Sequence, residues 1–213
     1  MKSKILLSTV LLALGFTHTV SAQELKEETG SKNYPHMFFG IHGGAQTTFT
    51  NYKMGKLITP TYGASFGGYF NPIVGTRIHV SGYENKGGIK ELDKTYEYKY
   101  VNSNIDLLLN VTNMFSQNKD RVFNLILFGG IGLQYAWDND DLNGMSGIQT
   151  TQMPRIWDDN LLSHNIRAGL QLDFNITKHF GINMELAANN TSDRYNSKTN
   201  NSNDWLVTRT EDL

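Results

Sequence analysis

The sequence of 213 residues contains no cysteine and has little net charge. Without cysteine there are no disulfides, no thiolate nucleophiles and no cysteine-ligated metals. The 19 Lys and Arg residues nearly balance the 20 Asp and Glu residues, which gives a formal net charge of −1. No basic excess favours nucleic acid and no acidic excess favours a cationic partner. We therefore expect no nucleic-acid partner.

Long apolar runs are absent beyond residue 22. No later stretch approaches the ~20 residues that a membrane-spanning helix requires. The first 22 residues combine a basic start (MKSK), an apolar run (ILLSTVLLALGF) and small residues before a cleavage point (TVSA). This layout is typical of a secretory signal peptide that is cut after Ala22. The expected organisation is a signal peptide at 1–22, a flexible leader at 23–36 and one barrel domain at 37–213.

Glycine, aromatic residues and period-two alternation are abundant. The chain has 20 Gly, 10 Tyr and 11 Phe. From Ile166 to Ile176, apolar residues alternate with residues such as Arg167 and Asp173, and this pattern predicts a half-buried strand. Eight such segments predict an all-β fold, at 37–49, 61–72, 74–88, 96–111, 123–138, 162–177, 180–190 and 204–209.

The lengths of the connections indicate how the strands are arranged. Longer loops mainly follow odd-numbered strands and short turns follow even-numbered ones, as in an up-and-down barrel with loops at one end and turns at the other. The connection after the fourth strand, near 112–122, fits least well. The last segment, DWLVTR, turns charged after a few residues, so we expect the eighth strand to cover only about half of the first. The predicted fold is an antiparallel, up-and-down, eight-stranded transmembrane barrel with a short eighth strand.

The polar face of the alternation mixes both charge signs with amides and is poor in lysine. In the third predicted strand it consists of Arg77, His79, Ser81 and Tyr83. Soluble surfaces favour Lys and Glu, whereas Arg and Asp in mid-strand are typical partners across a narrow polar interior. We therefore predict that the polar face points inward and the apolar face meets lipid. The predicted interior polar network comprises Arg77, His79, Asp106, Arg167, Asp173 and Glu185.

Four stretches carry a family resemblance: YVNSNIDLLLNVTNMF, NKDRVFNLILFGGIGLQYAW, AGLQLDFNITKHFGINMELAANN and DRYNS. With them, the region from about residue 37 to about residue 205 resembles the OmpA-type eight-stranded outer-membrane barrels of Bacteroidetes. The resemblance implies a location in the outer membrane after export. Members of that group often continue into a periplasmic peptidoglycan-binding domain, which we do not expect in this chain. The final aromatic residue typical of such barrels is also missing, because the chain ends in Leu213.

Motifs for catalysis are missing. The sequence has no GxSxG, HExxH, P-loop or GxGxxG motif in a suitable context, and the acidic stretch DNDDLNG lacks the Glu and the helices of a calcium loop. We expect no catalytic residues, no cofactor and no metal site. The expected role is a non-enzymatic envelope protein that presents surface loops, with outer-membrane lipid and other cell-envelope components as its partners; no ligand is identified.

Three alternatives remain open. A loop could bind a ligand, with Trp157 as the contact candidate, although this Trp could equally pack its loop onto the barrel rim. A carboxylate–histidine pair such as Asp106 with His79 would be the core of an enzymatic barrel. A soluble lipocalin-like carrier, with its faces exchanged, is the third alternative.

Overall fold

The computed structural model describes residues 9–13, 34–48, 54–89, 93–116, 121–141, 155–156, 161–177, 179–191 and 198–199. The fold is all-β, and it forms an antiparallel up-and-down barrel as predicted. Its strands are β1 (Thr9–Ala13), β2 (His36–Thr48), β3 (Thr59–Tyr69), β4 (Val74–Ile89), β5 (Lys94–Asn110), β6 (Phe123–Trp137), β7 (Arg155–Ile156), β8 (Leu161–Asn175), β9 (Gly181–Thr191) and β10 (Lys198–Thr199). The helical elements are η1 (Met54–Lys56) and α1 (Val111–Phe115).

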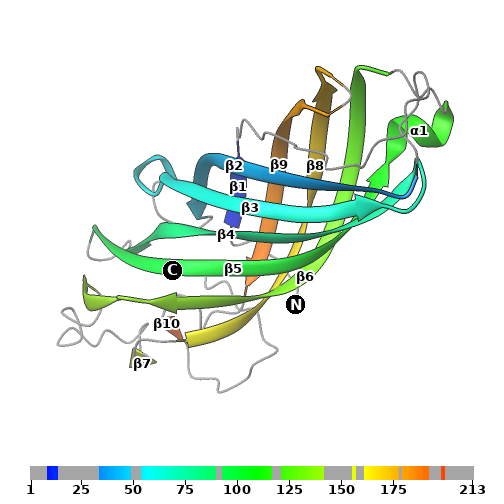
Figure 1. The fold of residues 1–213 in the computed structure, drawn as a ribbon. Helices are drawn as coiled ribbons and strands as arrows, with labels where there is room; N and C mark the ends of the chain where they lie inside the picture. The colour runs from blue at the N-terminus through cyan, green and yellow to red at the C-terminus, as the bar shows by residue number, and fades with distance from the viewer. Residues whose placement is uncertain are drawn as a thin grey trace, which may run out of the picture.

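Seven long strands form the wall, each paired with its neighbour in sequence. The order runs β2-β3-β4-β5-β6-β8-β9, and every ladder is antiparallel. The two short strands β7 and β10 pair with each other and, among the described residues, with no other strand. In Figure 1 the long strands lie side by side and curl about a common axis. No helix among the residues that the structure describes is long and apolar enough to cross a membrane.

A short segment from the start of the chain completes the ring. Strand β1 lies between β2 and β9 and pairs with Ala45–Thr48 on one side and with Glu185–Asn189 on the other. It therefore covers only a third of β2 or less. We expected 204–209 in this position, but that segment lies outside the described residues. The strand found there is short, but it comes from the region predicted to be the signal peptide, so the expectation for 204–209 stays a prediction.

The two ends of the barrel differ in their connections. One end carries the connections at 49–58, 90–93 and 138–160, of which the first and last are long, and we call it the loop end. The other end carries the β3–β4 turn, the β8–β9 turn and the segment that follows β5, and we call it the turn end. That segment contains helix α1 (Figure 1), which explains why a connection at this end is longer than the other two.

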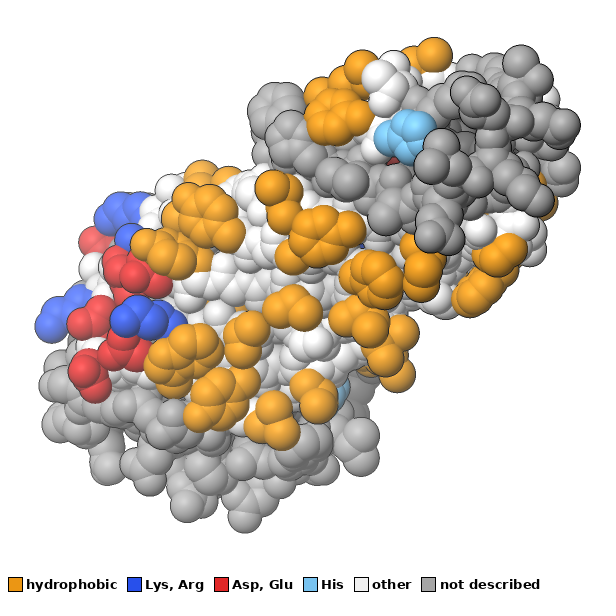
Figure 2. Space-filling view, in the orientation of Figure 1, with side chains coloured by type: hydrophobic (Ala, Val, Ile, Leu, Met, Phe, Trp, Pro, Cys, Tyr) orange, Lys and Arg blue, Asp and Glu red, His pale blue; other side chains and the backbone are white. Residues whose placement is uncertain are grey.

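The apolar face of the strands points outward, as predicted. Alternate residues along β5 and β6 are exposed, and Ile131 on β6 has 69% of its surface exposed. Orange side chains cover the visible barrel wall in Figure 2, while Lys, Arg, Asp and Glu gather at the loop end. The other exposed wall residues include Phe39, Ile41, Phe66, Ile78, Val80, Ile105, Leu107, Leu127, Leu133, Leu170 and Met184. We call this set, with Ile131, the apolar belt.

Tyr83 departs from the predicted pattern. It pairs with Thr61 and Tyr100, whose side chains are buried in the interior. Its backbone has φ 144°, and its side chain is half exposed and meets Tyr62 edge to face at 5.6 Å. We expected Tyr83 inside, and this prediction is wrong. Such a positive φ is rare for a residue with a side chain. It directs Tyr83 outward, while its cross-strand partner Tyr100 points into the interior.

A charge placed on the apolar belt should destabilise the barrel in lipid. Ile131→Arg should lower the free energy of unfolding by about 2–4 kcal/mol, because the guanidinium would have to lie in hydrocarbon. Ile131→Val keeps the residue apolar and serves as the control. Denaturant titrations of both variants in lipid vesicles measure the difference, and equal stabilities would show that this face does not meet lipid.

Candidate functional site

The barrel interior is the candidate site, because most buried polar side chains in the described residues point there. Along β5 the inward positions are Tyr96, Tyr98 and Tyr100 near the loop end, Asn102, Asn104 and Asp106 in the middle, and Leu108 near the turn end. The strand thus orders the interior into layers. Tyrosines are followed by amides, then by charges and finally by an apolar cluster.

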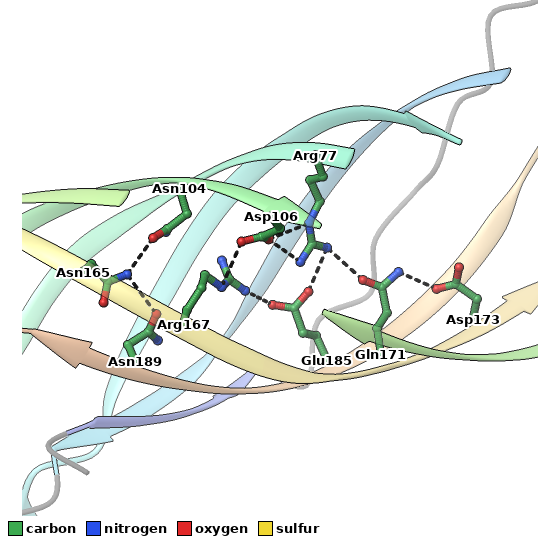
Figure 3. Close-up of polar contacts among 9 residues, drawn as sticks. All are labelled: Arg77, Asn104, Asp106, Asn165, Arg167, Gln171, Asp173, Glu185 and Asn189. Atoms are coloured by element: carbon green, nitrogen blue, oxygen red, sulfur yellow. Dashed lines mark hydrogen bonds and ion pairs between the residues drawn. The ribbon is translucent and has the colours of Figure 1, made fainter. Parts of the chain in front are cut away.

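Two arginines and two carboxylates form the charged layer (Figure 3). Arg77 and Asp106 are direct cross-strand neighbours on β4 and β5. The Arg77 guanidinium lies 2.8 Å from Oδ2 of Asp106 and 2.9 Å from Oε2 of Glu185. Arg167 contacts the same two carboxylates: it forms an ion pair with Glu185, and its Nε lies 3.7 Å from Oδ1 of Asp106. Each charge therefore meets two of opposite sign, and the formal charges cancel.

The charged layer is almost completely removed from solvent. Asp106 is 0% exposed and Arg167 is 2% exposed. Burial of a charge is unfavourable unless the charge is paired and hydrogen-bonded. The alternating arrangement of the four charges supplies this pairing, and it bridges β4, β5, β8 and β9 across the interior.

An aromatic ring packs against both arginines on the side that faces the turn end. The guanidinium carbons of Arg77 and Arg167 lie 4.9 Å and 4.8 Å from the centre of the Phe128 ring. Such cation–π contacts strengthen when they are shielded from water. Phe128 also belongs to a buried apolar cluster at the turn end, formed by Tyr69, Leu108, Ile126, Phe128 and Ala187, against which Tyr34 and Phe38 pack. Burial raises the pKa of the Tyr34 phenol.

An amide layer lies on the loop side of the charges. Nδ2 of Asn165 donates to Oδ1 of Asn104 at 2.6 Å and lies 3.2 Å from Oδ1 of Asn189 (Figure 3). It also lies 3.2 Å from Oδ1 of Asn102. Nearer the loop end, the Tyr100 hydroxyl donates to Oε1 of Gln46 at 2.7 Å. These bonds connect β2, β5, β8 and β9 through the interior.

Glycines on β6 leave room for these contacts. Gly130 pairs with Asp106 on one side and with Arg167 on the other. A Cβ at Gly130 would lie 2.3 Å from Oδ1 of Asp106, and one at Gly132 would lie 2.4 Å from Oδ1 of Asn104. Side chains from β5 and β8 can therefore meet only because β6 has no side chain between them.

The structure brings most of the predicted network together. Arg77, Asp106, Arg167 and Glu185 contact one another, and Asp173 joins through Gln171, whose Nε2 donates to Oδ1 of Asp173 at 2.6 Å. Oε1 of Gln171 accepts from Arg77 at 2.8 Å. Sequence reasoning did not single out Gln171 for the network, although it shares the phase of its strand neighbours Arg167 and Asp173.

His79 is buried but lies outside the hydrogen-bonded network. Its ring stacks on His42, with 4.3 Å between the ring centres. Both ring nitrogens of His79 and Nε2 of His42 have no hydrogen-bond partner. His79 and Asp106 therefore do not form the carboxylate–histidine pair that an enzymatic barrel would use. In the described part of the chain no three His, Asp or Glu residues are placed to hold a metal ion. Trp157 lies outside the described residues.

Comparison with known proteins gives one relative. The chain is 27% identical over 204 aligned residues to a Porphyromonas gingivalis protein named outer membrane protein 40. The alignment covers 87% of this chain and 50% of that protein, so this chain spans about half the length of its relative. No family model matches the chain, and no solved structure matches it.

Loss of one charge from the network should be far more damaging than loss of the unbonded histidine. Arg167→Met should lower the free energy of unfolding by about 3–5 kcal/mol, because it leaves Asp106 and Glu185 with one arginine between them. His79→Leu should change it by less than about 1.5 kcal/mol, since no hydrogen bond is lost. Urea titrations of the refolded variants measure both values. A larger effect at His79 than at Arg167 would contradict the assignment.

The two adjacent glycines of β6 provide a matched pair. Gly130→Ala should destabilise the barrel by about 1–3 kcal/mol, because its methyl group would displace Asp106 from Arg167. Gly129 points outward, and a Cβ there meets only a backbone oxygen at 3.9 Å, so Gly129→Ala should be neutral or slightly stabilising. The same titrations compare the two, and similar losses would show that interior space is not the cause.

Proposed function

We propose that this protein is a non-enzymatic outer-membrane barrel of the OmpA type, with a plugged polar interior, that contributes to envelope structure and presents surface loops. The observation that carries this proposal is the inverted distribution of side chains. Leucine, isoleucine and phenylalanine cover the wall, while arginine and aspartate are buried inside. A soluble lipocalin-like barrel has its apolar side chains inside.

The backbone supports a location in lipid. A sheet in the bilayer must pair its strands around a ring, because no water is present to satisfy free N–H and C=O groups. The seven long strands form the continuously paired wall that such a ring requires. The relative named as an outer membrane protein supports the same location, as does the predicted signal peptide at 1–22.

The filled interior supports a structural role over transport. The interior of an eight-stranded barrel is just wide enough for side chains to fill. Here the ion pairs of Arg77 and Arg167 cross it, and the cluster around Phe128 follows toward the turn end. We expect no continuous water path. Surface loops remain the part of the chain that could meet other cell-envelope components.

Cell fractionation combined with surface proteolysis tests the location. The protein should appear in the detergent-extracted outer membrane, and its band should shift on heating, as expected of a folded barrel. Protease added to intact cells should cleave within the long connection at 138–160. Recovery in the soluble periplasmic fraction would contradict the proposal.

Planar-bilayer recordings test the plugged interior. The purified, refolded protein should give no stable large conductance, because ion pairs and the Phe128 cluster fill the lumen. A wide porin in the same bilayer serves as the positive control. Stable, large single-channel steps from the wild-type protein would contradict the plug while leaving the barrel itself intact.

A further inference from the structure

Helix α1 presents apolar side chains that nothing in the described protein covers. Phe115 is 85% exposed, the highest value among the large hydrophobic side chains of the described residues. Met114 beside it and Val122, which directly precedes β6, are also more than half exposed. The segment Val111–Ser116 carries no charged side chain. An aromatic ring so exposed to water is unfavourable by the usual measure of apolar burial.

Several contacts hold this helix in one position. Oδ1 of Asn110 caps it by accepting from the backbone N–H of Asn113 at 3.0 Å. Nδ2 of Asn113 donates to the carbonyl of Pro72 at 2.9 Å, which ties the helix to the β3–β4 turn. The Thr112 hydroxyl accepts from the backbone N–H of Leu125 at 2.6 Å, which ties it to β6. The direction of Phe115 is therefore fixed by the barrel.

The basic residue nearest this helix among the described residues is used inside the fold. The Arg121 guanidinium donates to the carbonyl of Ser116 at 2.9 Å and to that of Thr112 at 3.4 Å. Ser116 lies at the end of the helix, where backbone acceptors lack partners, while the Thr112 carbonyl also accepts from the N–H of Ser116 at 3.2 Å. Arg121 thus stabilises the helix end, and the exposed face keeps its apolar character.

The apolar surface of α1 continues into the belt. Phe70 lies in the β3–β4 turn, two residues before Pro72, and is exposed. The carbonyl of Val122 accepts from the N–H of Asn175 at 2.7 Å, which places Val122 against the end of β8. There the rings of Phe123 and Phe174 meet at 5.4 Å on the outer face. An apolar band therefore runs around the turn end on the outside of β3, α1, β6 and β8.

The loop end has the opposite character. Lys99 lies 2.5 Å from Asp138, and Lys86 lies 2.5 Å from Glu97. Lys, Arg, Asp and Glu side chains gather at one end of the molecule in Figure 2, while α1 lies at the other end of the barrel in Figure 1. Charged groups favour water, and exposed aromatic side chains favour the boundary between headgroups and acyl chains.

We propose that helix α1 is an interfacial anchor, with Phe115 and Met114 inserted among the lipids of the leaflet at the turn end. The occupant of this surface is the boundary between headgroups and acyl chains, since Val111–Ser116 carries no charged side chain and its exposed face is continuous with the lipid-facing belt. This inference rests on the proposed membrane location. It adds that the connection after β5 holds the barrel at a fixed depth and does not lie free in the aqueous space.

Tryptophan fluorescence with brominated lipids tests this depth. Trp137, Trp157 and Trp205 are first replaced by Phe, and single Trp residues are then introduced as Phe115→Trp, Met114→Trp, Ile131→Trp and Lys94→Trp. Each variant is refolded into phosphatidylcholine vesicles whose acyl chains carry bromine either near the headgroup or deeper. Ile131→Trp reports the belt, and Lys94→Trp reports water at the loop end.

We expect Phe115→Trp and Met114→Trp to show blue-shifted emission and to lose most fluorescence to bromine near the headgroup, with little loss to aqueous acrylamide. Ile131→Trp should respond to the deeper bromine, and Lys94→Trp to acrylamide alone. If both helix variants respond only to acrylamide while Ile131→Trp is quenched by lipid, the anchor is wrong and the membrane barrel stands. If Ile131→Trp also escapes lipid quenching, both proposals fail.

Discussion

Backbone hydrogen bonding in lipid is the constraint on which this structure depends. A strand in hydrocarbon must have a paired strand on each side, so the sheet has to close into a ring. A ring of so small a number of strands encloses only a narrow lumen. The outward face then has to be apolar, and the polar groups of each strand are directed into the lumen. There Arg77, Asp106, Arg167 and Glu185 pair with one another because no water supplies partners.

Space in that narrow lumen decides which residues can stand opposite a large polar side chain. Asp106 and Arg167 lie on strands separated by β6, and they reach each other across Gly130. Asn104 and Asn165 meet across Gly132 in the same way. The strength of the network therefore depends on residues that take no part in it. The apolar ring of Phe128 completes the arrangement by shielding both guanidinium groups on one side.

The lysine-poor mixture of Arg, Asp and amides on one face predicted that this face points inward. Period-two alternation was enough to predict the strands, because the residues between Ile166 and Ile176 alternate cleanly. It was also enough to place Arg77, Asp106, Arg167 and Glu185 in one interior. It could not show that His79 stacks on His42 instead of joining the charges, because alternation gives the face and not the rotamer. The cluster around Phe128 was missed because an apolar residue in an inward position looks like an interruption of the pattern. The prediction that Tyr83 points inward was wrong because of the backbone at this position, since a φ of 144° turns the side chain outward.

The seam between β2 and β9 shows what a closing strand has to provide. In the described ring, Leu11 stands opposite Gln46 on β2 and Ala187 on β9, and both of these residues are buried inward. Any segment in this slot must therefore alternate in the same phase, with one residue in two directed into the lumen and the others toward lipid. Strand β1 pairs with Ala45–Thr48, which leaves the edge of β2 from His36 to Gly44 without a paired strand among the described residues. The backbone N–H and C=O groups of that edge also need a paired strand, because hydrocarbon contains no other hydrogen-bond partner for them.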